Sequence, residues 1–179
     1  WEAADAEHQP VLALHTAGPP KSQPVRRPAS VAIYEAARWP AATIDLELKS
    51  LEPVDLVGAD ACVILGYRDE THYTYIHLSN DADGRVHNVI MKVEGDTRRM
   101  IQTPVRPEPR LGEGWQSVRI TYDATGAIAV YMNDLETPLM TAHDPDVPAG
   151  HVGVGSFNDR AAFAALRVDG QRLVDGPAN

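Results

Sequence analysis

An alternating pattern occupies residues 43–49, which read Thr43-Ile44-Asp45-Leu46-Glu47-Leu48-Lys49. The isoleucine and the two leucines take every second position, and charged residues take the positions between them. Successive side chains of a β-strand point to opposite faces of a sheet. The pattern therefore predicts a strand with one face in an apolar core and the other face in water.

Similar runs recur along the chain. They cover residues 61–67, 73–78, 86–93, 97–102, 117–122, 127–132, 152–157 and 162–168. Turn-forming stretches rich in Asp and Gly separate several of them. Only a short segment near 34–38 suits a helix, and Pro40 would end it. About eight to eleven short strands without a long helical period predict an all-β fold, an antiparallel jelly-roll β-sandwich.

The chain of 179 residues has the size of a single domain. Its segment 15–30 contains Pro19, Pro20, Pro24 and Pro28. Such a composition excludes both a helix and a central strand. We therefore expect residues 1–30 to form an N-terminal edge strand, near 11–14, and a proline-rich connector. Residues 31–179 are expected to form the β-sandwich.

The formal net charge of −9 and the sequence pI of about 5.1 oppose binding to a phosphate backbone. We therefore expect no nucleic-acid partner. No apolar run reaches the length needed to cross a bilayer, so membrane insertion is not expected. The single cysteine, Cys62, lies in the apolar run 61–65, cannot form an intramolecular disulfide, and is expected to pack in the core.

Four ordered parts of the chain carry a family resemblance. They are residues 43–49, residues 63–69 with 73–78, residues 114–120, and residues 148–155 with 163–168. Their order is similar to that in the concanavalin A-like lectin/glucanase superfamily, especially its laminin-G-like and 3-keto-disaccharide hydrolase-like bacterial domains. The resemblance implies a jelly-roll fold, an oligo- or polysaccharide partner, and an extracellular or periplasmic location. The N-terminal residues 1–9 carry no signal-peptide pattern.

Aromatic and polar side chains gather on and around the run 73–78. They are Tyr67, Arg68, Tyr73, Tyr75, His77, His87, Asn88 and Lys92. By alternation, Tyr73, Tyr75 and His77 share one face of their strand. Ile76 and Leu78 share the other face, toward the core. The outward face would then form a concave sugar groove, since sugars bind aromatic rings beside a few placed polar groups. Alternatively, the tyrosines are cross-strand pairs that support an exposed sheet.

The following run leaves a choice between two faces. His87 alternates with Val89 and Val93, whereas Asn88 alternates with Lys92. If the valines belong to the core, Asn88 and Lys92 project into the groove.

A carbohydrate-binding domain is the first functional hypothesis. The second is a glycan-active enzyme, a glycoside hydrolase or a polysaccharide lyase, with His77 or His87 as its base and with Tyr75 assisting. Tyr34 and Glu35 are further candidates for an acid–base pair, with His77, in the manner of the keto-disaccharide group. The third is a laminin-G-like structural or adhesion module. The Glu-x-Asp-x-x-Glu motif of the superfamily's retaining glucanases is absent, which excludes that assignment.

The turn at residues 81–84 is a candidate metal site. Asp81 and Asp83 flank an alanine and precede Gly84, and closely spaced carboxylates suit calcium. Structural calcium also recurs in the superfamily. A plain hairpin turn is the alternative. We expect no other cofactor, because the sequence contains no phosphate-binding glycine loop.

Overall fold

The computed structural model describes residues 1–6, 9–81, 85–103, 110–147 and 149–173. In these ranges the chain forms strands and no helix. The strands are β1 (Glu2–Ala6), β2 (Gln9–Leu14), β3 (Ser30–Trp39), β4 (Ala42–Ser50), β5 (Asp60–Asp69), β6 (His72–Ser79), β7 (Val89–Glu94), β8 (Thr97–Met100), β9 (Gln116–Tyr122), β10 (Ala127–Met132), β11 (Met140–His143), β12 (Gly150–Ser156) and β13 (Ala161–Asp169). The prediction of a short helix near 34–38 is wrong, because these residues belong to β3. Nothing in the described ranges forms a helix of the length and hydropathy that a bilayer crossing requires.

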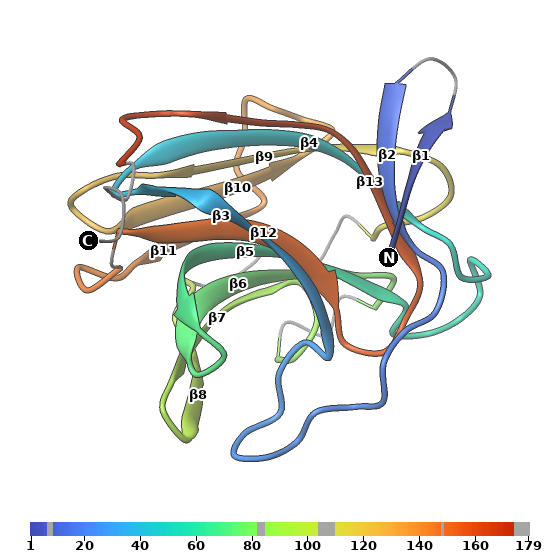
Figure 1. Ribbon diagram of the computed structural model, residues 1–179, viewed down its shortest axis with the longest axis horizontal. Helices are drawn as coiled ribbons and strands as arrows, with labels where there is room; N and C mark the ends of the chain where they lie inside the picture. The colour runs from blue at the N-terminus through green and yellow to red at the C-terminus, as the bar shows by residue number, and fades with distance from the viewer. Residues whose placement is uncertain (7–8, 82–84, 104–109, 148, 174–179) are drawn as a thin grey trace.

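The strands build two antiparallel sheets that face each other (Figure 1). The seven-stranded sheet has the order β1-β2-β13-β4-β9-β10-β11, and the six-stranded sheet has the order β3-β12-β5-β6-β7-β8. Apolar side chains from both sheets form one core between them. This arrangement confirms the predicted all-β, antiparallel sandwich of the jelly-roll type.

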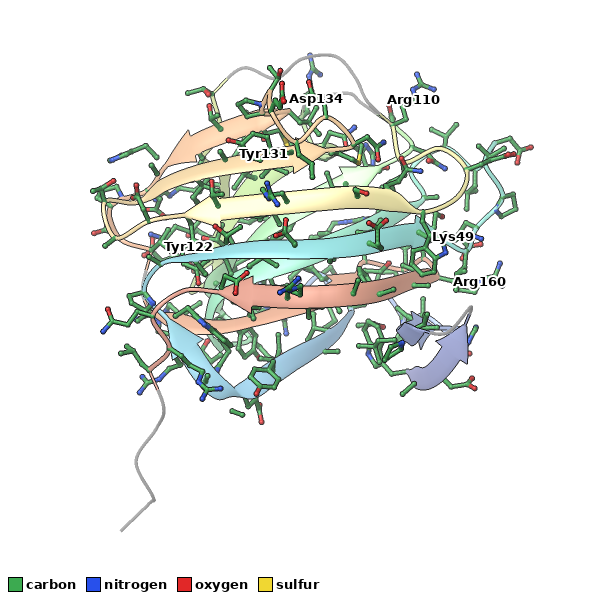
Figure 2. All side chains as sticks on the ribbon, turned by 90° about the horizontal axis from the view of Figure 1, so that it is seen from above. Lys49, Arg110, Tyr122, Tyr131, Asp134 and Arg160 are labelled. Carbon is green, nitrogen blue, oxygen red and sulfur yellow. The ribbon has the colours of Figure 1, made fainter. Side chains whose placement is uncertain are left out.

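The strand β4 shows how the alternating pattern builds the sandwich. Ile44, Leu46 and Leu48 are buried in the core between the sheets. On the outer face, Asp45 accepts a hydrogen bond of 2.7 Å from Arg119 of β9. Figure 2 looks onto this outer face of the seven-stranded sheet and shows that nitrogen- and oxygen-bearing side chains cover much of it. The apolar half of the period thus seals the core, and the polar half meets water.

The N-terminal strands extend the seven-stranded sheet. The strand β2 pairs with β13, with Leu14 opposite Ala161, and includes the strand expected near 11–14. The strand β1 pairs with the other side of β2. After Leu14 the chain crosses to the six-stranded sheet, where β3 begins at Ser30.

A buried ion pair links the two sheets. Lys92 of β7 is 5% exposed, and Asp144, which follows β11, is 2% exposed. The ammonium Nζ of Lys92 lies 3.1 Å from Oδ1 and 3.0 Å from Oδ2 of Asp144. Lys92 therefore points into the sandwich, and the prediction that it projects into a surface groove is wrong. Its partner lies 52 positions along the chain, beyond the reach of a local pattern.

Replacing Lys92 with methionine should destabilise the fold. The apolar stem is retained, but the carboxylate of Asp144 loses its cation while it stays buried, which costs about 3–5 kcal/mol in the free energy of unfolding. Urea unfolding followed by tryptophan fluorescence measures this loss. The matched control, Arg119→Met, breaks the half-exposed surface pair with Asp45 and should cost far less. Equal losses from the two variants would contradict the role of the buried pair.

Candidate functional site

The predicted alternation of β6 is confirmed, but its tyrosine face is covered. Ile76 and Leu78 lie in the core between the sheets, and Tyr73 and Tyr75 lie on the opposite face. Tyr73 is 4% exposed and Tyr75 is 0% exposed. They belong to a second apolar cluster with Cys62, Ile64, Val89, Met91, Val93 and Phe157. The prediction that these two tyrosines floor an open groove is therefore wrong.

Part of the cover comes from the connector between β2 and β3, residues 15–29, which we call the strap. Val25 packs against the tyrosine cluster. Arg27 donates a hydrogen bond of 2.8 Å to Glu70, and the backbone N–H of Ala29 donates to a carbonyl of β12 at 3.0 Å. In Figure 1 the strap loops along the lower side of the six-stranded sheet. Residues far apart in sequence make these contacts, so alternation within β6 could not reveal them.

The prediction that Asn88 projects into a groove is wrong. Val89 pairs directly with His77 and joins the tyrosine cluster. Asn88 adopts a left-handed φ of 51° and is 2% exposed. Its Oδ1 accepts a hydrogen bond from the backbone N–H of Ser79 at 3.1 Å, and its amide donates to the backbone carbonyl of Asp81 at 3.1 Å. Asn88 therefore holds the connection between β6 and β7.

Four other predicted site residues lie toward the start of β6. Tyr34 is 49% exposed on β3, and Glu35 and Arg68 are also exposed. Tyr67 is half-buried, with its ring centroid 5.6 Å from that of Tyr73. Burial, and then the charge of nearby carboxylates, raises the pKa of Tyr67. A cleft with acid–base side chains lies instead at the other end of β6.

This cleft has a volume of about 490 Å³. Its polar lining residues are Arg26, Asp60, His77, His87, Arg98, Asn158 and Asp159, and its other lining residues are Leu56, Val57, Gly58, Val86 and Phe157. They come from the strap, from β5, β6 and β8, and from the loops before β5, between β6 and β7, and after β12. The volume lies within the range of about 300–1,000 Å³ typical of small-molecule sites. The cleft is therefore the candidate functional site.

His77 forms part of the cleft wall and is held in a fixed orientation. Its Nδ1 lies 2.5 Å from the carbonyl oxygen of Val86, which can only accept, so Nδ1 carries the proton. Its Nε2 lies 3.3 Å from Oδ2 of Asp60. The ring stacks on Phe157 with centroids 4.8 Å apart, and the ring of His87 lies 5.4 Å away. The structure thus brings together both histidines that the sequence proposed as candidate bases.

Two carboxyl groups with different environments line the cleft. Oδ1 of Asp60 accepts hydrogen bonds from Oγ of Ser156 at 2.8 Å and from the backbone N–H of Phe157 at 2.9 Å. Burial acts to raise the pKa of Asp60, but His77 and these hydrogen bonds outweigh it, and the pKa is lowered. Burial, and then the charge of Asp60, raises the pKa of Asp159 to about 6. As the pH rises, Asp60 therefore loses its proton before Asp159, and Asp159 titrates near pH 6.

Two arginines complete the lining. The guanidinium of Arg26 lies over the ring of Phe157, 5.5 Å from its centroid. Arg98 donates to the hydroxyl of Tyr75 at 3.4 Å and to the carbonyl of Arg26 at 3.3 Å. Burial raises the pKa of Tyr75, which keeps its hydroxyl protonated. Tyr75 is therefore placed to hydrogen-bond Arg98 rather than to act as a base.

The predicted calcium turn is described only in part. Asp83 lies outside the described residues. The carboxylate of Asp81 lies 3.6 Å from Nδ1 of His87. Calcium at this turn stays a prediction.

Within the ranges that the structure describes, one group of side chains could hold a metal ion. Asp60, Cys62 and His77 place their ligand atoms within 4.8 Å of one another, and all three are buried. Burial, and then the carboxylates of Asp60 and Asp159, raises the pKa of the Cys62 thiol.

Sequence reasoning missed several cleft residues. Asp60 had a usable signal, because it stands two positions before Cys62 and so shares its face of β5. Cys62 in turn pairs across the sheet with His77. No local signal marks Arg26 or Asp159, because the strap and the turn after β12 reach the cleft through tertiary contacts.

No family model and no curated protein sequence matches the chain. Among solved structures, the chain is similar to a galectin from Caenorhabditis elegans, with 10% identity, 88% of this chain and 95% of that chain covered, and a TM-score of 0.48. It is similar to an alginate lyase from Pseudomonas aeruginosa, with 13% identity, 94% and 86% covered, and a TM-score of 0.48. It is also similar to CG-16, a homodimeric agglutinin from chicken liver, with 12% identity, 82% and 100% covered, and a TM-score of 0.48. These structures have the concanavalin A-like fold that the sequence resembles. At such identities and TM-scores they carry no argument about the cleft.

Replacing Arg27 with alanine should loosen the strap. The Arg27 side chain is 10% exposed and anchors the strap to Glu70, so its loss favours local opening. Hydrogen exchange should become roughly tenfold faster at the backbone amide of Ala29, which corresponds to about 1.4 kcal/mol of local stability. Lys21→Ala is the matched control, because Lys21 also contacts Glu70, at 3.5 Å, but is more exposed. Unchanged exchange in Arg27→Ala would show that this pair does not hold the strap.

Proposed function

We propose that the protein binds a carbohydrate in the cleft that His77 and His87 line. The observation that carries this proposal is the convergence of seven polar side chains on a cleft of about 490 Å³ that also has an apolar rim. Pockets for small molecules combine apolar walls with a few placed polar groups in this way.

The chemistry of the lining suits a ligand rich in hydroxyl groups. The guanidinium groups of Arg26 and Arg98 are donors only, and an ionised carboxylate such as that of Asp60 is an acceptor only. A sugar hydroxyl can bond to both kinds of group. Leu56 and Val57, which are 42% and 79% exposed, offer apolar surface to the CH faces of a sugar ring.

The ligand class rests on the resemblance to the concanavalin A-like superfamily, and so does an extracellular or periplasmic location. A laminin-G-like adhesion role would be favoured by a flat, apolar outer face without a cleft. The polar outer face of the seven-stranded sheet and the cleft beside β6 do not favour it (Figure 2).

A glycan-active enzyme is the second candidate. It is favoured by the presence of His77, Asp60 and Asp159 in one cleft, because imidazole and carboxyl groups are the usual acid–base residues of enzymes. The binding experiment below therefore includes an analysis of products.

Substituting Val57 with tryptophan should block glycan binding. Val57 lines the cleft and is largely exposed, so an indole can fill the mouth without disturbing the core. A glycan array on the wild-type chain identifies the ligand, and calorimetry then measures its affinity. We expect Val57→Trp to weaken binding more than about tenfold, or 1.4 kcal/mol.

Val54→Trp is the matched control for this experiment. Val54 lies in the same loop and is 50% exposed, but it does not line the cleft. Its affinity should stay within about twofold of the wild type, or roughly 0.4 kcal/mol. Equal affinities for Val57→Trp and the wild type would overturn the placement of the ligand. Shortened or unsaturated products in the wild-type sample would establish the enzyme instead.

A further inference from the structure

Three side chains with different metal-binding atoms meet on one face of the six-stranded sheet. Asp60 and Cys62 stand two positions apart on β5, so both project to the same side. His77 of β6 is the direct cross-strand partner of Cys62. Carboxylate oxygen, thiol sulfur and imidazole nitrogen consequently lie within 4.8 Å of one another in a buried site.

The imidazole of His77 is oriented as in a metal ligand. Its Nδ1–H donates to the carbonyl of Val86, which leaves Nε2 as the atom that faces Asp60. Histidine ligands of metals typically donate their other ring N–H to a carbonyl or carboxylate in this manner. Among the described residues, Nε2 makes no hydrogen bond of good geometry, although the side chain is 6% exposed and Oδ2 of Asp60 lies 3.3 Å away. A cation bound here would satisfy both this buried nitrogen and the carboxylate that faces it.

Hydrogen bonds also hold the carboxylate of Asp60 in an orientation that suits a metal ligand. Its Oδ1 accepts hydrogen bonds from Ser156 and from the backbone of Phe157. Its Oδ2 faces Nε2 of His77 across 3.3 Å. Two ligands at about 2.0 Å from a tetrahedral zinc ion are themselves separated by roughly 3.3 Å. The spacing of these two atoms thus already fits a shared metal ion.

We propose that Asp60, Cys62 and His77 bind a divalent transition metal ion, with zinc as the best match. Thiolate and imidazole ligands favour zinc and related ions over calcium and magnesium. A carboxylate, a thiolate and a neutral imidazole balance the charge of a divalent cation, so the buried site carries no net charge. Cys62 binds as the thiolate, and its proton passes to solvent.

The fourth coordination position faces the cleft. Asp60 and His77 both line the cleft, whereas Cys62 is fully buried beneath them. Zinc sites with three protein ligands commonly hold water or substrate in the remaining position. This site goes beyond the proposed carbohydrate binding and does not depend on it.

Cobalt(II) added to the metal-free, tag-free chain tests the proposal. Cys62 is the only cysteine of the chain, so any thiolate-to-cobalt charge-transfer absorption must come from it. We expect this absorption to saturate at a single equivalent of cobalt, together with the intense visible bands of tetrahedral coordination, and zinc should abolish both. A folded wild-type chain that gives no charge-transfer band with excess cobalt would overturn the proposal, whatever the variants do.

Variants then assign the remaining ligands. His77→Asn and Asp60→Asn should each weaken cobalt binding more than about tenfold, with folding checked by circular dichroism. His72→Asn is the control, because His72 lies on the same strand but contacts Asp69 at the surface. Equal binding by His72→Asn and His77→Asn would also overturn the assignment. The Val57→Trp variant should keep the cobalt spectrum even if it no longer binds glycan. The metal site and the carbohydrate site can therefore be refuted independently of each other.

Discussion

The central strands β5, β6 and β7 of the six-stranded sheet are buried on both faces, and the position of the cleft depends on this double burial. One face seals the core against the seven-stranded sheet, and the other lies under the strap and the residues that follow β12. Each strand of such a sheet must satisfy two apolar environments at once. Buried polar groups on these strands are paired, as Lys92 is with Asp144, or they lie at the end of the sheet that the strap and the residues after β12 leave uncovered.

The cover ends at the Asp60–His77 end of the sheet, and the polar side chains there are tightly constrained. Ser156 and the backbone of Phe157 hold Asp60, and Val86 holds His77. Side chains fixed in this way lose little freedom when a ligand or ion arrives, which favours binding. Burial acts to raise the pKa of both carboxyl groups, but at Asp60 His77 and the hydrogen bonds outweigh it, so the pKa of Asp60 is lowered while that of Asp159 is raised.

Local patterns were sufficient to predict the strands and their two faces. The alternation in β4 and β6 placed Ile44, Ile76 and Leu78 correctly in the core. The same patterns could not tell which outer face meets water, because that depends on what the rest of the chain lays over it. The pattern therefore predicted that the tyrosines of β6 line an open groove, although the strap helps to cover them. It also predicted that the ammonium group of Lys92 lies at the surface, although it is buried.

The candidate site was predicted in part, for a related reason. His77 and His87 were identified because they are rare, chemically distinctive residues close together in sequence. Asp60 begins a strand and Asp159 lies in a turn, both common positions for aspartate, and only the folded sheet shows that they share a cleft.

The strap also bears on how ligand size could diverge among related chains. The distance along β6 from Tyr73 to His77 is four residues, or roughly 13 Å of strand. The exposure of that length depends partly on the strap, and loops tolerate insertions and deletions far better than strands do. A shorter connector would uncover more of the tyrosine face while the strands beneath it stay unchanged.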